Sequence, residues 1–77
     1  MRETPRPVGF TWFSGAKLRA ARTRAGMSRN TLARRIDFLA GTQTIMRYET
    51  GRTVPTTNTA LAMARALDIA LEDLTDA

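Results

Sequence analysis

The sequence predicts an all-α protein in which five short helices surround one core. Three observations support this fold class. Apolar residues recur at i, i+3, i+4 and i+7 in separate segments, as on one face of an α-helix. Residues that cap helix starts and glycines that end helices separate these segments. No stretch alternates apolar and polar residues, so we expect no β-strand.

The composition excludes several classes of function. The 77 residues make one domain, and they include neither cysteine nor histidine. A disulfide framework, a thiolate or imidazole metal site and a nucleophilic triad are therefore not expected. We predict no enzymatic activity and no cofactor. No apolar run approaches the length of a membrane span, and no secretory signal is present, so we expect a soluble cytoplasmic protein without membrane contact.

We expect residues 1–13 to form a mobile arm and residues 14–77 to form the folded domain. The arm contains two prolines and a glycine and has no helical period. It is expected to become ordered near its aromatic residues, Phe10, Trp12 and Phe13, which we interpret as core packing. Arg2 and Arg6 either reach a nucleic-acid phosphate or minor groove, or belong to an unbound tail.

The first two helices are predicted by their caps and their apolar faces. Ser14 caps the first helix, whose inner face holds Leu18 and Ala21, and Gly26 ends it. Ser28 caps the second helix. Its inner face is Leu32, Ala33 and Ile36, and its outer face is Arg29, Arg34 and Arg35.

Caps and apolar faces also predict the remaining helices. The third spans roughly residues 42–50, with Ile45 and Tyr48 inward, and Gly51 ends it. Pro55 and Thr56 open the fourth helix. Its inner face is Ala60, Met63, Ala64 and Leu67. A last helical turn holds Ile69, Leu71 and Leu74. The two leucines can form a dimer seam or close the core of a single chain.

The order of these parts resembles the XRE (Cro and phage-repressor) family of helix-turn-helix domains. The resemblance covers about residues 13–74. It rests on LRAARTRAGMS at residues 18–28, on Leu32-Ala33, on the run from Ile45 through YETG to Pro55, and on MARALDI at residues 63–69. It implies a lambda-repressor-like fold with the helix-turn-helix at helices 2 and 3. It also implies that Arg22 and Glu49 form a buried ion pair that holds helix 3.

The segment Asp37-Phe38-Leu39-Ala40-Gly41 departs from the family pattern. Asp37 stands where the family has glycine, and the turn is about two residues longer than usual. Two geometries are open. Asp37 can adopt the left-handed conformation and end helix 2, which we favour slightly. Alternatively, helix 2 continues to Leu39, and Gly41 ends it.

The resemblance implies a DNA-reading role for the outer face of helix 3. Thr42, Gln43 and Arg47 are the candidate base contacts, because their side chains can recognise thymine, adenine and guanine respectively. The candidate phosphate contacts are Arg29, Thr44 and Arg52, which would set register and affinity.

Charge agrees with a polyanionic partner. Residues 1–52 carry a net charge of +8 and residues 53–77 a net charge of −3. We therefore predict a sequence-specific regulator, most simply a repressor, that binds double-stranded DNA as a homodimer at a palindromic operator. The alternative is an antitoxin or adaptor that binds a toxin or another protein through residues 1–13.

Overall fold

The computed structural model describes residues 12–76, which contain four α-helices and one 3₁₀ turn. The elements are α1 (Gly15–Arg24), α2 (Arg29–Arg35), α3 (Thr42–Glu49), α4 (Thr57–Ala66) and the 3₁₀ turn η1 (Leu71–Leu74). None of the described helices is long and apolar enough to span a membrane. Most of the predicted arm, including Arg2, Arg6 and Phe10, lies outside the described residues.

The all-α class is as predicted, but the expectation of five helices is wrong. The segment expected to hold the fifth helix forms only η1. The reason lies in the backbone on either side. Asp68 adopts a left-handed conformation directly after α4, and Thr75 already pairs with Phe13 in an antiparallel bridge. Only one helical turn fits between these two constraints.

Three of the four helices begin at a residue whose side chain caps the helix. Ser14, Ser28 and Thr56 each accept a hydrogen bond from the backbone N–H three residues later, at 3.1, 3.0 and 3.3 Å. These bonds satisfy amides that have no partner within the helix. Helix α3 differs, because its N-cap is Gly41 and no side chain caps it.

All four helices end on a residue with a left-handed backbone. Gly26 and Gly51 end α1 and α3 at φ values of 72° and 78°, whereas Asp37 and Asp68 end α2 and α4 at 54° and 58°. In each case the next amide donates back to a carbonyl five residues earlier, which is the Schellman arrangement. Helix 2 therefore adopts the first of the two geometries considered from the sequence, and a long turn leads to Gly41.

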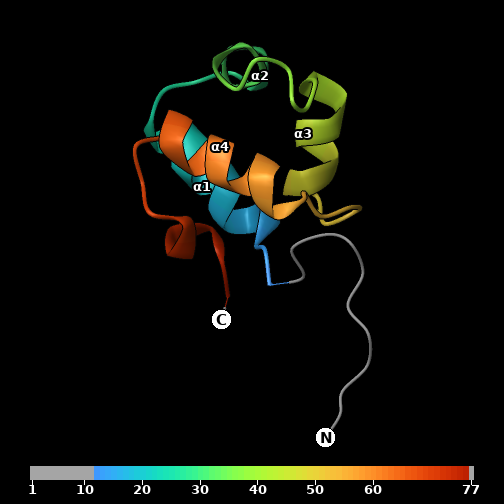
Figure 1. Ribbon diagram of the computed structural model, residues 1–77, viewed down its shortest axis with the longest axis vertical. Helices are drawn as coiled ribbons and strands as arrows, with labels where there is room; N and C mark the ends of the chain where they lie inside the picture. The colour runs from blue at the N-terminus through green and yellow to red at the C-terminus, as the bar shows by residue number, and fades with distance from the viewer. Residues whose placement is uncertain (1–11, 77) are drawn as a thin grey trace, which may run out of the picture.

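The core lies where the four helices meet. Leu18 of α1, Leu32 of α2, Ile45 of α3 and Met63 of α4 are completely buried. In Figure 1, α1 and α4 cross in the middle of the molecule, α2 lies at one end, and α3 stands along one side. Helix α3 packs against both α1 and α2. Its position is therefore set by two neighbours at once.

The start and end of the described chain close the bottom of the core. Ser14 N donates to Leu74 O at 2.7 Å, beside the bridge between Phe13 and Thr75. Leu74 is completely buried, and Leu71 is partly buried against the same core. Of the two roles left open for these leucines, Leu74 closes the core of the single chain.

Candidate nucleic-acid interface

Helix α3 presents one exposed polar face. Thr42, Gln43 and Arg47 are exposed, and Met46 between them is 37% exposed. Positions i, i+1, i+4 and i+5 lie side by side on a helix. Within residues 12–76, the side chains of Thr42, Gln43 and Arg47 have no hydrogen-bond or ion-pair partner. The three groups are therefore available to bind a ligand.

The opposite face of α3 is buried and fixes the helix against the domain. Ile45 is completely buried, and Tyr48 is 7% exposed. The Tyr48 ring contacts Phe13 edge-on, with 6.1 Å between the ring centroids. Burial raises the pKa of Tyr48 above its ordinary value, so the phenol is neutral near pH 7. This face is chemically inert and serves to hold the polar face outward.

A buried carboxylate ties the C-terminal end of α3 to the other helices. Glu49 Oε2 accepts a hydrogen bond from Arg22 Nε at 2.6 Å, and Glu49 Oε1 accepts one from Arg22 Nη2 at 3.3 Å. Arg22 Nη1 also donates to the carbonyl of Met27 at 2.7 Å. The Glu49 side chain is 1% exposed and that of Arg22 is 12% exposed. The structure thus contains the ion pair that the family resemblance implies.

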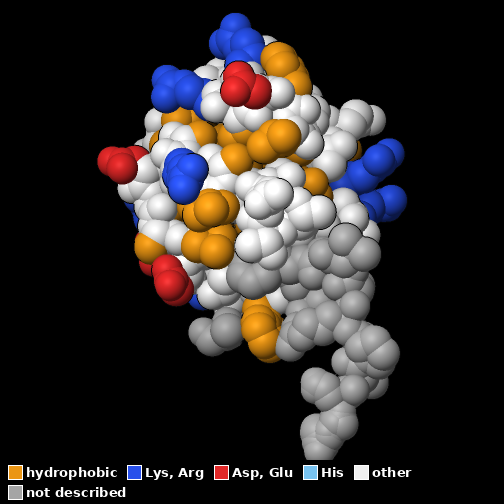
Figure 2. All heavy atoms as spheres, in the orientation of Figure 1, with side chains coloured by type: hydrophobic (Ala, Val, Ile, Leu, Met, Phe, Trp, Pro, Cys, Tyr) orange, Lys and Arg blue, Asp and Glu red, His pale blue; other side chains and the backbone are white. Residues whose placement is uncertain are grey.

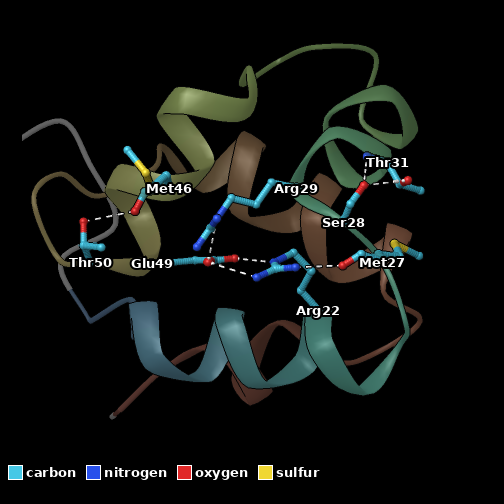
Figure 3. A network of polar contacts seen from close by, with 8 residues as sticks. All are labelled: Arg22, Met27, Ser28, Arg29, Thr31, Met46, Glu49 and Thr50. Carbon is cyan, nitrogen blue, oxygen red and sulfur yellow. Dashed lines mark hydrogen bonds and ion pairs between the residues drawn. The ribbon is translucent and has the colours of Figure 1, made fainter.

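A second arginine joins this network from α2. Arg29 Nε lies 3.0 Å from Glu49 Oε1, and its side chain is 32% exposed. In Figure 3, the guanidinium groups of Arg22 and Arg29 approach Glu49 from two different helices. Arg29 therefore points toward α3, whereas the sequence pattern placed it on the outer face of α2. One carboxylate with two cations leaves a positive charge at this junction.

Gly15 is a further structural residue that sequence reasoning missed. A Cβ atom on Gly15 would lie 2.1 Å from the Tyr48 carbonyl oxygen and 2.9 Å from the Glu49 carbonyl carbon. The first turn of α1 thus touches the backbone at the end of α3. The only signal in the sequence is a small residue directly after the Ser14 cap, which does not by itself indicate a close contact.

Comparison with known proteins places this arrangement in a family. A family model described as a helix-turn-helix domain matches residues 15–77, most of the chain. The chain belongs to the helix-turn-helix domain family. The helix-turn-helix domain expected from the sequence is thereby confirmed. No curated protein matches the chain.

A solved structure shows the same fold. The chain matches the crystal structure of the P22 c2 repressor protein, in complex with synthetic operator 9T in the presence of Tl+, with a TM-score of 0.73. The sequences are 22% identical, and the match covers 80% of this chain and 91% of that one. The likeness establishes the fold, in which α2 and α3 are the two helices of the helix-turn-helix.

The other predicted contact residues of the helix-turn-helix domain lie around α3. Thr44 is half-buried on the first turn of α3, whereas Arg52 is exposed in the loop that follows the helix. The backbone N–H of Arg52 donates to the Arg47 carbonyl at 2.9 Å, which fixes the start of that loop. The phosphate-binding roles of Arg29, Thr44 and Arg52 remain predictions.

Proposed function

We propose that this chain is a sequence-specific regulator of transcription that binds double-stranded DNA and acts by binding rather than by catalysis. The observation that carries the proposal is the exposed face of α3. Thr42, Gln43 and Arg47 lie side by side on a helix whose opposite face is buried and whose end is held by Glu49. A recognition helix needs both properties, because base edges are read at fixed positions in the major groove.

The side chains of this face suit the hydrogen-bonding groups of bases. Gln43 can pair with adenine through two hydrogen bonds, Arg47 can do the same with guanine, and the Thr42 methyl group can touch a thymine methyl. Each two-point contact discriminates against a wrong base by about 1–3 kcal/mol. Arg29, Thr44 and Arg52 would contact phosphates and set the register of the domain on the duplex.

Charge supports a DNA partner. Residues 28–52, which contain both helices of the helix-turn-helix, hold five arginines against Asp37 and Glu49. Glu49 is buried between two of the arginines and adds little negative potential at the surface. A basic surface of this kind attracts phosphate groups and releases the counterions bound to them.

We further propose a cytoplasmic repressor that binds a palindromic operator as a homodimer. One domain of this size makes too few contacts for tight specific binding at physiological salt. Two copies would place their α3 helices in successive major grooves, about 34 Å apart. The P22 c2 repressor, whose fold this chain shares, was crystallised with synthetic operator DNA, which supports the same mode of action here.

Selection from a random duplex library tests the proposal. The purified 77-residue chain is incubated with the library near physiological salt, and the bound DNA is sequenced after each round. We expect a palindrome with half-sites one helical turn apart. If no sequence is enriched, and binding only weakens as salt increases, sequence-specific reading by α3 is refuted. A single enriched half-site would refute the homodimer alone.

A further inference from the structure

The turn between α2 and α3 is held by backbone hydrogen bonds and contains two residues with unusual backbone conformations. Asp37 and Phe38 have φ values of 54° and 58°, a region that residues other than glycine rarely adopt. Three successive backbone N–H groups, those of Asp37, Phe38 and Leu39, donate to carbonyls of α2 and its C-cap at 2.8–3.1 Å. The turn therefore has a defined shape. Backbone outliers of this kind often occur at functional sites.

This turn exposes the two most exposed large hydrophobic side chains of the described residues. Phe38 is 60% exposed and Leu39 is 59% exposed. Comparison with the ends of α1 and α4 shows that this exposure is unusual. Met27 and Ile69 occupy the position after the left-handed residue at the ends of α1 and α4, and both pack against the core. Phe38 occupies the same position at the end of α2 but does not pack against the core, so its apolar surface does not stabilise the described domain.

The turn adjoins the end of α3 that the proposed function places in the groove. Leu39 is three residues before Thr42, so their Cα atoms are at most about 11 Å apart. The major groove is about 12 Å wide. A domain that inserts the first turn of α3 into the groove therefore brings Leu39, and Phe38 beside it, to the edge of the same groove.

Two exposed arginines and one exposed aspartate, Asp37, flank the apolar pair, which gives the turn a small net positive charge. Arg34 and Arg35, on the last turn of α2, are both exposed. In Figure 2, Lys or Arg side chains, hydrophobic side chains and an Asp or Glu side chain lie together at the top of the molecule, over α2 and the turn after it. An apolar pair beside cations fits DNA, which offers thymine methyl groups between rows of phosphates. Two copies placed turn against turn would each bring a net positive charge, so this arrangement is less favourable than contact with DNA.

We propose that Phe38 and Leu39 form a further DNA contact, against thymine 5-methyl groups at the edge of the sequence that α3 reads. This inference rests on the proposed function, since it requires α3 to lie in the major groove. It extends the recognition surface from one helix to the helix and the turn before it. The longer turn thus adds contacts to thymines beyond the one that Thr42 of α3 would touch.

The experiment removes the methyl group from the DNA and the apolar group from the protein, separately and together. The probe is the duplex enriched from the random library, with each thymine replaced in turn by deoxyuridine. The protein variant is Phe38→Asn with Leu39→Gln, because asparagine tolerates the left-handed conformation at position 38. The matched control is Phe38→Met with Leu39→Met, which keeps two apolar chains at the same positions. Circular dichroism establishes that both variants are folded.

We expect deoxyuridine at one or two positions beside the α3 contacts to weaken binding of the wild-type chain about fourfold per methyl group. The same replacements should not affect the Asn/Gln variant, and the Met/Met variant should retain the sensitivity. Equal sensitivity of the wild-type chain and the Asn/Gln variant at every thymine would overturn the inference. So would a changed oligomeric mass of the Asn/Gln variant with unchanged DNA affinity. Either result leaves the proposed function intact, whereas failure to enrich any duplex overturns both.

Discussion

The two ends of α3 are held in different ways. At its C-terminal end, Glu49 bonds to two arginines, Gly15 packs against the backbone, and Gly51 provides a left-handed stop. At its N-terminal end, Gly41 offers no side-chain cap, and the preceding turn exposes Phe38. One end is anchored in the domain, and the other is left open to a ligand.

This difference shows how a small domain can position a reading helix. Eight residues of α-helix are roughly 12 Å long, so a helix of this length behaves as a rigid rod. Fixing its C-terminal end against α1 and α2 therefore fixes the direction of its N-terminal end. The exposed end then needs few internal contacts of its own. The predictions below test the anchored end first and the open end afterwards.

The largest effect is expected from Glu49→Ala. The substitution leaves the nearly buried guanidinium of Arg22 without its carboxylate, and loss of one partner of a buried pair typically costs about 3–5 kcal/mol. We expect the free energy of unfolding, measured by urea denaturation, to fall by that amount. DNA binding should be lost together with the fold.

A double variant distinguishes the cost of leaving one buried charge unpaired from the contribution of the ion pair itself. In Arg22→Met with Glu49→Leu, Arg29 also loses its partner, but its side chain is 32% exposed and can turn to solvent. Apolar replacement of the buried pair itself is often close to neutral. We expect most of the stability to return. If Glu49→Ala alone changed stability by less than about 1 kcal/mol, as for an exposed pair, Glu49 would not be the anchor of α3.

The second prediction concerns the contact between α1 and α3. Gly15→Ala places a Cβ 2.1 Å from the Tyr48 carbonyl oxygen, so one of the two helices has to shift. Overpacking of this kind costs about 1–3 kcal/mol. The matched control is Gly41→Ala, whose Cβ meets nothing within 4 Å, so it should lose only the preference of an N-cap for glycine over alanine, roughly 0.5–1 kcal/mol. Equal thermal midpoints for the two variants would contradict the close approach.

The third prediction concerns the exposed face of α3 and separates binding from stability. Arg47→Ala removes an exposed side chain with no partner among the described residues, so the unfolding transition should not change. Discrimination between the selected duplex and random DNA should fall about 5- to 150-fold per half-site, because the lost guanine contact accounts for about 1–3 kcal/mol. The measurement is the ratio of affinities for the selected duplex and for random DNA. An unchanged ratio would remove Arg47 from the reading surface.

The fold was predictable to the extent that it depends on local signals. The caps at Ser14, Ser28 and Thr56 and the stops at Gly26 and Gly51 are set by residues next to each other in the chain. The fifth helix was overestimated because the pairing of Thr75 with Phe13 joins the two ends of the chain, and no local pattern reports such a contact.

The candidate site was predictable only where it depends on local sequence patterns. Periodicity identifies the outer face of α3, but it cannot show how far a long side chain reaches toward another helix. Arg29 was therefore assigned to the outside of α2, although its guanidinium bonds to Glu49. Gly15 was missed because its importance depends on a backbone more than thirty residues away, at Tyr48.

The smallest effect is expected at the left-handed residues that end α2 and α3, which lie on either side of α3 in the sequence. Asp37 and Gly51 both have left-handed backbones, but only glycine adopts this conformation without a Cβ penalty. We expect Asp37→Gly to raise the free energy of unfolding by roughly 0.5 kcal/mol and Gly51→Asp to lower it by a similar amount, since the added flexibility of glycine in the unfolded chain offsets part of each change. Urea denaturation without DNA measures both. If Asp37→Gly instead lowered stability, the Asp37 side chain would contribute more to the turn than its backbone costs. The turn would then depend on aspartate itself, and the exposed position of Phe38 should be retested in that variant.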